Sequence, residues 1–257
     1  MAFISNAYTD VGIKKKTNQD SALLMEAQTD LGDVALCVIC DGMGGLAEGE
    51  LASAHVIKAF SAWFKNELKE MLYNGFSPVD LEKSWSNIIY NKNTELMLYT
   101  RENNIAKGLG TTVAALLLYD SKYYILNVGD SRIYRHNGEL VQLTEDQTFI
   151  NREVKLGNMT PEQAATDPRR SVLLQCVGAS QFVEPEYEYG SFSKEDTFIL
   201  CSDGFRHEVS HKELEDAFMP HKLKSDAKIA QIQKQIVELN KKRMETDNIT
   251  VITIKAI

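Results

Sequence analysis

Apolar stretches in this chain repeatedly end at an aspartate. "VALCVIC" is followed by Asp41, "YYILNVG" by Asp130 and "TFILCS" by Asp203, while Asp247 stands directly before "NITVITI". Because Asp and Gly are common turn residues, each aspartate taken alone is explained as a turn. Strands of one sheet can end near each other, however, and clustered carboxylates repel one another unless they are protonated or neutralised by a cation.

The predicted cluster contains only oxygen ligands, and this chemistry suits hard cations. We therefore expect Mg²⁺ or Mn²⁺ rather than zinc. Two such ions, about 3.5 to 4 Å apart, lower the pKa of a bridging water and produce a hydroxide that attacks phosphorus or a carbonyl carbon. Residue type and position thus predict metal-dependent hydrolysis and leave the substrate open.

The pattern along the chain predicts strands, then two long helices, then strands again. Strand patterns cover residues 3–11, 21–27 and 33–40, and a helical apolar stripe covers 46–72. A second helix is expected to begin at Pro78. This order predicts an α+β layered protein rather than a parallel βαβ sheet.

The second half of the chain returns to strand patterns. A β-meander is expected over "TTVAALLLY", "KYYILNVG", "SRIYRHNG" and "ELVQLT", with hairpin chemistry at Asn137–Gly138. Short helical pieces in 146–182 suggest a lobe added to the sheet. Strands at "EYEYGSF" and "DTFILCS", a helix over 224–242 and a last strand "NITVITIKAI" complete the chain.

The net charge of the chain and the lengths of its apolar runs exclude some classes of binding partner. The net charge of -8 repels nucleic-acid phosphates and anionic lipid, so we expect no nucleic acid and no membrane partner. No apolar run approaches the roughly 18 residues of a membrane span. The first residues lack the order of a secretory signal, so the expected location is the cytoplasm.

The four cysteines are too few and too scattered for a disulfide scaffold, and we expect reduced, buried thiols. Cys37 and Cys40 form a C-x-x-C pattern, for which a redox pair is the alternative. In a strand, however, positions 37 and 40 face opposite sides, whereas redox pairs usually open a helix. A redox function is therefore the weaker hypothesis.

Seven short motifs give the chain a family resemblance. They are "TNQD" at 17–20, "DGMGG" at 41–45, "GTT" at 110–112, "VGDSRIY" at 128–134, "LTEDQT" at 143–148, "SDGF" at 202–205 and "DNITV" at 247–251. In order and spacing the chain resembles the PP2C-type (PPM) metal-dependent protein serine/threonine phosphatases. The resemblance covers nearly the whole chain, and the compact length is similar to the bacterial stand-alone branch.

The resemblance implies one domain over residues 1–257. Its expected fold is a central β-sandwich of two antiparallel sheets flanked by antiparallel helix pairs, a four-layer αββα arrangement with the metals in a cleft at one edge. Residues 146–182 resemble the flap subdomain that bacterial members insert into this domain. Flaps over clefts often gate access and select substrates.

Site residues are carried over from the resemblance one by one. Asp41 would bridge two metal ions, with the Gly42 carbonyl on one of them and Asp203 and Asp247 on the other. Asp130, with Asp203, would hold a third, weaker ion. Asn18 and Asp20 would lie close by, Asp20 through metal-bound water.

The implied activity is hydrolysis of phosphoserine and phosphothreonine in proteins by a metal-bridging hydroxide, with Mn²⁺ or Mg²⁺ as cofactor. Two dications would both generate the nucleophile and offset charge on the transferring group, so no covalent phospho-enzyme is needed. The expected partners are phosphorylated protein substrates and a cognate serine/threonine kinase in the same cell, with the phosphatase acting as a monomer.

The chain departs from the family pattern at Lys15, where relatives usually have an arginine that binds the substrate phosphate. Lysine offers a point charge without the planar fork of arginine. In an extended strand Lys15 faces the side opposite to Lys14 and Lys16, so Lys15 is predicted to point into the cleft. The alternatives are a solvated charge run at "KKK", or a catalytically inactive module that binds phosphoprotein.

The chain also departs from the family pattern at the position of the proton donor and in the flap. Met43 replaces a histidine proposed in eukaryotic members to protonate the leaving group, so proton delivery is expected to fall to water. The five histidines show no ligand spacing and are expected at surface or helix positions. In the flap, Asp167 and Gln175 replace residues that are commonly basic, and Arg169 and Arg170 either contact phosphoprotein or are simply exposed.

Overall fold

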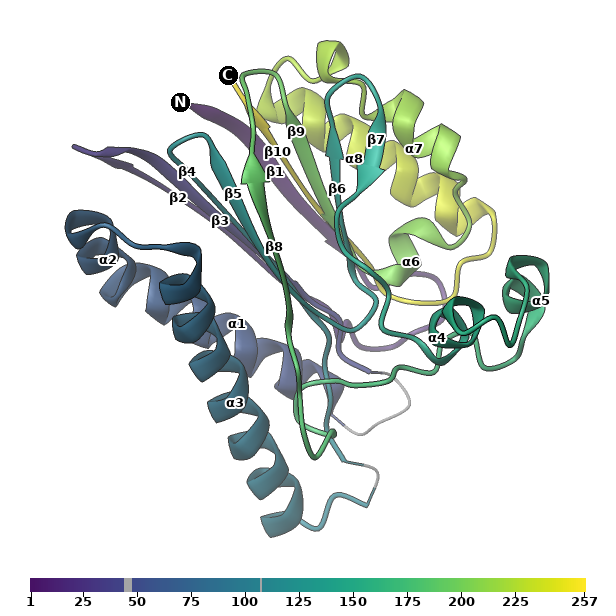
Figure 1. Cartoon of the computed structure of the whole chain (residues 1–257). Coiled ribbons are helices and arrows are strands. Elements are labelled where there is room, and N and C mark those ends of the chain that lie inside the picture. The colour runs from purple at the N-terminus through teal and green to yellow at the C-terminus, as the bar shows by residue number, and fades with distance from the viewer. Residues whose placement is uncertain (44–47, 107) are drawn as a thin grey trace.

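The computed structural model describes residues 1–43, 48–106 and 108–257. Two five-stranded antiparallel sheets pack face to face, and helices cover each outer face (Figure 1). The first sheet has the order β1 (Phe3–Asp10), β10 (Ile249–Ala256), β9 (Thr197–Cys201), β6 (Arg132–His136) and β7 (Leu140–Gln142). The second has the order β2 (Ser21–Thr29), β3 (Gly32–Cys40), β4 (Val113–Tyr119), β5 (Lys122–Val128) and β8 (Glu186–Ser191). The predicted α+β sandwich is confirmed.

Strand β3 shows how the sequence fills both sides of the second sheet. Its even-numbered residues, Val34 to Cys40, pack toward the helices, and its odd-numbered residues, Ala35 to Ile39, pack between the two sheets. Because both faces are covered, the strand is apolar throughout rather than alternating. Cys37 and Cys40 lie in these two different clusters, so the prediction that they face opposite sides is confirmed.

One outer face is covered by α1 (Gly49–Asn66), α2 (Leu68–Asn74) and α3 (Pro78–Glu102). The single helical stripe expected over 46–72 is divided in two at Glu67, and its residues 46 and 47 lie outside the described residues. The long helix α3 begins at Pro78, as predicted, with Ser77 and Asp80 forming a reciprocal capping box.

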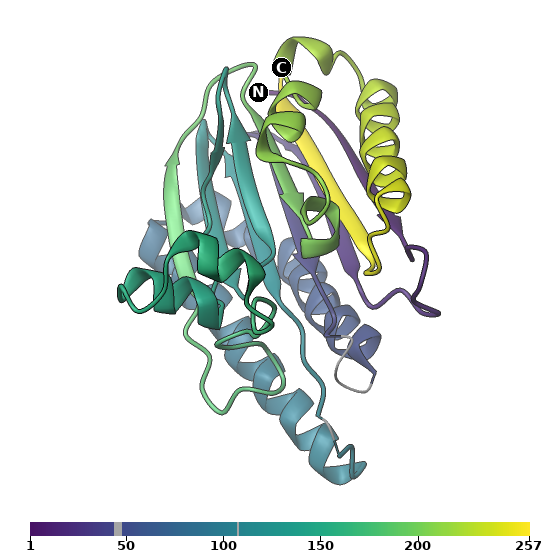
Figure 2. The ribbon, with the colours of Figure 1, turned by 90° about the vertical axis from the view of Figure 1, so that its right-hand side faces the viewer.

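The other outer face is covered by the long helix α8 (Asp226–Lys242) and by α7 (His211–Ala217), with a short 3₁₀ helix (Pro220–Lys222) between them (Figure 2). A four-residue helix, α6 (Asp203–Arg206), follows β9. The helical pattern predicted over 224–242 is confirmed. The two short helices α6 and α7 were not predicted, because a few residues do not show a helical period.

The β-meander predicted for the middle of the chain is wrong in one respect. Strands β4 and β5 form a hairpin in the second sheet, with positive φ at Asp120 and Ser121, whereas β6 and β7 form a hairpin in the first. The chain therefore crosses from one sheet to the other at 129–131. This crossing carries Asp130 to one end of the sandwich, between the two sheets.

Residues 146–182 contain two short helices, α4 (Phe149–Lys155) and α5 (Pro161–Thr166), which extend beyond the sandwich (Figure 1). The segment is tied together by the Arg169 guanidinium, which lies 4.4 Å from the Phe149 ring centroid. Isolated bridges pair Thr148 with Leu173 and Val177 with Thr111. Among the described helices, none has the length and apolar content needed to cross a membrane.

The capping box at Ser77 generates a stability prediction. Replacing Ser77 with Ala removes the acceptor for the Asp80 N–H and should lower the free energy of unfolding by about 1 kcal/mol. Ser77→Thr keeps an acceptor oxygen and is the matched control. Urea denaturation compares the two variants, and an equal loss in both would show that the cap does not stabilise α3.

Candidate functional site

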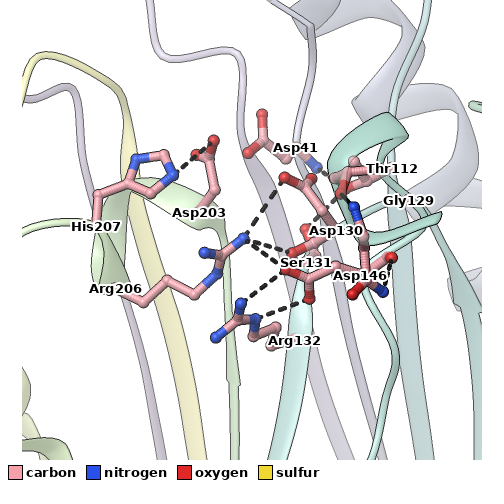
Figure 3. A network of polar contacts seen from close by, with 12 residues as sticks. Asp41, Thr112, Gly129, Asp130, Ser131, Arg132, Asp146, Asp203, Arg206 and His207 are labelled. Carbon is pink, nitrogen blue, oxygen red and sulfur yellow. Dashed lines mark hydrogen bonds and ion pairs between the residues drawn. The ribbon is translucent and has the colours of Figure 1, made fainter. Parts of the chain in front are cut away.

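The predicted aspartates meet at one end of the sandwich. Asp41 follows β3, Asp130 lies in the crossing before β6, Asp203 opens α6 and Asp247 precedes β10. Figure 3 shows Asp41, Asp130 and Asp203 gathered beside one another from different elements. Asp20, which precedes β2, is buried at the same place. Antiparallel strands of both sheets thus deliver five carboxylates to one location.

Asp41 is held in place through its backbone. Its N–H donates to the Thr112 hydroxyl at 3.0 Å, and the Thr112 N–H donates to the Asp41 carbonyl at 2.9 Å. The Thr112 hydroxyl also lies 2.8 Å from the hydroxyl of Ser131, next to Asp130. The "GTT" and "VGDSR" motifs therefore connect two of the acids by hydrogen bonds between buried hydroxyl groups.

Gly42 is required by close packing of the backbone. A Cβ at this position would lie 2.4 Å from the carbonyl oxygens of both Gln19 and Gly49. The Gly42 N–H donates to the Gln19 carbonyl at 3.1 Å. This contact brings the segment 17–20 against the turn after Asp41, which explains why a glycine follows the acid.

The carboxylates strongly perturb one another. Burial raises the pKa of Asp41 well above its ordinary value, and the neighbouring Asp20, Asp203, Asp130 and Asp247 raise it further. Burial, reinforced by Asp203, raises the pKa of Asp130 to about 7. Burial also raises the pKa of Asp20 to about 6. In the absence of a cation, the cluster therefore favours the protonated form of these groups.

Two oxygen atoms in the cluster have no hydrogen-bond partner among the residues that the structure describes. Oδ1 of Asp20 and Oδ1 of Asp203 are both buried and unpaired. Within the described ranges, no three His, Cys, Asp or Glu side chains already form a metal cage. The cluster nevertheless suits a hard divalent cation, because its carboxylates repel one another and two of their buried oxygens are unpaired. Such a cation would bind these oxygens and neutralise their charge.

Lys15 reaches the cluster, as expected. Its Nζ lies 2.8 Å from Oδ1 of Asp247, while Lys14 and Lys16 are exposed. The backbone there is not the extended strand assumed from the sequence, because residues 12–14 form a turn. Burial disfavours the charge on Lys15, but the hydrogen bond to Asp247 and the fields of Asp41 and Asp203 outweigh it and raise its pKa.

Asn18 and Asp20 border the cluster. The Asp20 N–H donates to Oδ1 of Asn18 at 3.2 Å, and Nδ2 of Asn18 donates to the Thr9 hydroxyl at 2.7 Å. Oδ2 of Asp20 accepts from the Ser202 hydroxyl at 3.0 Å, beside Asp203. Asp20 thus connects the segment after β1 to the end of β9.

Asn248 fastens the segment that carries Lys15. Its Oδ1 accepts from the Gln19 N–H at 2.9 Å, and its Nδ2 donates to the carbonyls of Val11 and Thr17. Because Asn248 follows Asp247 directly, these contacts fix Lys15 and Asp247 relative to each other. The "DN" pair at 247–248 therefore combines a site acid with the residue that positions its partner.

Three charged residues, Arg206, Arg132 and Asp146, lie beside the cluster (Figure 3), and their presence there was not predicted. The Arg206 guanidinium donates to the Asp130 carbonyl at 3.1 Å and lies 3.5 Å from carboxylate oxygens of both Asp130 and Asp146. Arg132 donates twice to Asp146, at 2.8 and 2.7 Å. Asp146 and Arg132 fall inside quoted motifs, but nothing in the sequence pairs them.

One histidine, His136, contradicts the expectation of surface or helix positions, whereas His207 has the expected surface position at the end of α6 but also contacts the cluster. His136 is fully buried in β6, where its Nε2 lies 3.0 Å from the Glu215 carbonyl. His207 lies 3.5 Å from Asp203 and 3.4 Å from Glu245. Burial disfavours the charged form of His207, but Glu245 and Asp203 outweigh this effect and raise its pKa.

In segment 146–182, both Arg169 and Arg170 are exposed, which is one of the two alternatives expected for them, and Arg169 already has a partner. Arg169 donates two side-chain hydrogen bonds to Asp167, at 3.0 and 2.8 Å. Gln175 donates to Gln147 and to the Glu184 carbonyl, which fastens the segment to the loop before β8. Arg170 is exposed and stays a candidate for contact with a protein substrate.

The cysteines take no part in the site. All four are free and buried, as predicted. Burial raises the pKa of Cys37 and Cys40, and it raises the pKa of Cys201 to about 12. Because the thiolate is the nucleophilic form, these thiols are poor nucleophiles and poor redox groups. The redox hypothesis for the C-x-x-C pattern therefore has no structural support.

Comparisons with known proteins agree with this geometry. The sequence profile of the family described as "Protein phosphatase 2C" matches residues 13–241. The chain is 30% identical to the "Serine/threonine phosphatase stp" of Listeria monocytogenes serotype 4b over 249 residues, covering 96% of this chain and 93% of that protein. The family match includes Asp20, Asp41, Asp130 and Asp203 of the cluster, and the match to the Listeria protein covers nearly the whole chain.

Solved structures of serine/threonine phosphatases are also similar to this chain. The serine/threonine phosphatase Stp1 from Staphylococcus aureus is similar with a TM-score of 0.85 and 29% identity, covering 100% of this chain and 96% of that one. The catalytic domain of the serine/threonine protein phosphatase PstP, solved with two manganese ions, has a TM-score of 0.78 and 28% identity, covering 98% and 97%.

The raised pKa of Asp130 predicts a pH dependence of stability in the metal-free protein. The pKa of an aspartate in the unfolded chain is about 3.9, whereas the pKa of Asp130 in the folded protein is about 7. Between these two pH values the folded state therefore binds more protons than the unfolded state. This stabilisation is complete at low pH and is lost as the pH rises. The stability of the wild type relative to Asp130→Asn should therefore fall across this range.

Urea denaturation in the presence of a chelator measures this difference. Asp30→Asn, which removes an exposed carboxylate from the β2–β3 turn, controls for the loss of a surface charge. A wild-type-minus-variant difference that stays constant from about pH 4 to about pH 7 would contradict the prediction.

The ion pair between Lys15 and Asp247 predicts an effect on metal affinity. Because the Lys15 ammonium lies 2.8 Å from Asp247, it competes with a cation for that carboxylate. Lys15→Met should therefore tighten Mn²⁺ binding by about 3- to 10-fold, as measured by titration calorimetry. Lys14→Met is the matched control, and unchanged or weaker binding in Lys15→Met would refute the competition.

Proposed function

Since this chain belongs to the protein phosphatase 2C family, we propose that its acidic cluster is the site where phosphate is removed from serine and threonine side chains of proteins. The chain is a serine/threonine protein phosphatase, like the relatives that align over nearly its whole length. The proposed location rests on one observation: buried, mutually repelling carboxylates converge beside a lysine at one end of the sandwich.

The carboxylates of Asp41, Asp203 and Asp247, with the Gly42 carbonyl, are proposed to hold two divalent cations. Asp130, together with Asp203, is proposed to hold a third. When bound, such cations lower the pKa of a coordinated water and offset negative charge on the phosphoryl group. The buried Oδ1 of Asp203, which has no hydrogen-bond partner among the described residues, supports this assignment. Two manganese ions in the PstP structure support Mn²⁺ and a count of two core ions.

Lys15 is proposed to bind an oxygen of the substrate phosphate. Its ammonium group is half-buried and already stands among Asp41, Asp203 and Asp247, whose fields maintain its charge. A phosphate dianion entering the site would compete with Asp247 for this ammonium. Because lysine supplies a point charge, it would attract the phosphate without imposing the bidentate orientation that arginine gives.

His207 and Arg206 are proposed to position the acids. His207 lies between Asp203 and Glu245, and Arg206 reaches both Asp130 and Asp146. These contacts hold the carboxylates of Asp203 and Asp130 in place. Because Met43 carries no proton donor, the proton for the departing serine or threonine oxygen is proposed to come from water.

The biological setting is proposed from the same chemistry. Phosphoproteins are the substrates of the named relatives' class, so we propose a cognate serine/threonine kinase in the same cell. Four unpaired, buried thiols suit a reducing compartment, which supports the cytoplasm. We propose that residues 146–182 form a flap within the single domain over 1–257, because α4 and α5 extend beyond the sandwich next to Asp146.

Release of phosphate from a phosphothreonine peptide tests the proposed function. The wild type should require Mn²⁺ or Mg²⁺, and Asp41→Asn and Asp203→Asn should each lower kcat/KM by about 100-fold or more. Asp30→Asn, at an exposed turn, should leave the rate unchanged.

Two results would refute this assignment. Activity that persists in a chelator would exclude a metal-dependent mechanism. Binding of the phosphopeptide without turnover at any metal concentration would instead indicate an inactive binding module.

A further inference from the structure

A groove lies on the outer face of the first sheet, between the end of α7, the short 3₁₀ helix and the start of α8. It has a volume of about 640 Å³. Its lining residues are Ala217, His221, Lys222, Lys224, Ser225, Lys228, Ile232, Gln235 and Ile236. None of the residues assigned to the acidic cluster belongs to it.

The groove is basic in an acidic protein. Lys222, Lys224 and Lys228 line it together with His221, and no Asp or Glu is among the described lining residues. The Lys222 ammonium donates to the Asp216 carbonyl, and the Lys228 ammonium donates to Oε1 of Gln231 at 2.9 Å. Within the described part of the chain, neither ammonium is paired with a carboxylate in these contacts. Against a net charge of -8, this concentration of cations marks a surface suited to carboxylates.

The floor of the groove is apolar. Ile232 and Ile236 are only 5% and 7% exposed, and Ala217 lies beside them. An occupant that uses both features would place carboxylates against the lysines and an apolar side chain against the two isoleucines. A short acidic peptide segment with an aliphatic residue has this chemistry.

The walls of the groove are preformed. The buried Lys255 ammonium donates to the carbonyls of Pro220 and Leu223, which fixes the turn that carries Lys222 and Lys224. The Ser225 hydroxyl accepts from the Lys228 N–H and caps α8. Because these contacts hold the backbone of both walls, little ordering is needed on binding.

We propose that this groove docks an acidic, partly aliphatic segment of a phosphoprotein substrate, at a distance from its phosphorylated residue. The proposal rests on the proposed function. Asp247 lies two residues before β10, and Lys255, near the other end of this strand, holds the turn that carries Lys222 and Lys224, so these lysines and the acidic cluster are separated by the length of the eight-residue strand, about 25 Å. An extended substrate would need about eight or more residues between the two sites.

A polyanion such as nucleic acid, or an anionic membrane surface, fits less well. Both present extended arrays of phosphate and would meet the field of a chain with net charge -8 outside the groove. The apolar floor would also have no partner on a phosphate backbone. A short peptide makes contact only within the groove, where the local charge is positive.

Phosphopeptide kinetics with Mn²⁺ test the proposal. One peptide carries phosphothreonine alone, a second adds Glu and Leu residues about 8 to 12 positions away, and a third replaces those Glu residues with Gln. Extensions are placed on either side of the phosphothreonine. The acidic extension should raise kcat/KM by about 5- to 10-fold through KM, and added salt should reduce this gain.

The double variant Lys224→Glu/Lys228→Glu should abolish the gain and leave hydrolysis of the unextended peptide unchanged. Lys234→Glu is the matched control, because Lys234 is an exposed lysine of the same helix α8 that does not line the groove. Fluorescence anisotropy with a labelled, unphosphorylated acidic peptide measures docking directly and should show the same loss in the double variant only.

The outcomes separate this proposal from the proposed function. If the unextended peptide is hydrolysed and all three peptides react equally, docking is refuted while the phosphatase assignment stands. If no peptide is hydrolysed but the acidic peptide binds in the groove, the proposed function fails instead. Binding of single-stranded DNA or phosphatidylglycerol vesicles, lost in the double variant, without binding of the acidic peptide would also overturn the docking proposal.

Discussion

Mutual repulsion among buried carboxylates is the constraint on which the rest of this structure depends. Asp41, Asp130 and Asp20 all have raised pKa values because the fold removes them from water and places them beside one another. Such an arrangement opposes folding and must be stabilised by the remainder of the domain. Three apolar clusters, one between the sheets and one under each helical layer, supply that stabilisation.

The cations around the cluster come from different parts of the chain, and each acts on particular acids. Lys15 follows β1 and pairs with Asp247, while Arg206 and His207 end α6 and reach Asp130 and Asp203. Each pair offsets part of the electrostatic repulsion among the acids. A divalent cation would relieve the repulsion that is left. The same carboxylate charges that destabilise the metal-free fold would therefore favour metal binding.

Features set by local pattern could be predicted from the sequence. Continuous apolar runs predicted β3 and β4, and the Gly and Asp residues that follow these runs predicted the strand ends. Lys15 lies next to Asp247 although its backbone forms a turn rather than the expected strand. Contacts between distant segments could not be predicted. Arg206 meets Asp130 only because the chain crosses between sheets at 129–131, and the buried contact of His136 with Glu215 depends on the docking of α7.

Strand β10 gives the molecule a fixed internal length. Asp247 stands before its first residue, and Lys255, near its last, holds the turn that forms the basic groove. A β-strand in the middle of a packed sheet cannot stretch, so the two ends stay about 25 Å apart. A substrate whose acidic segment matches that span would gain effective concentration at the acidic cluster, whereas one with a shorter spacing could engage only one site. If the groove docks substrates as proposed, selectivity for a protein substrate would depend on spacing as much as on the residues next to the phosphate.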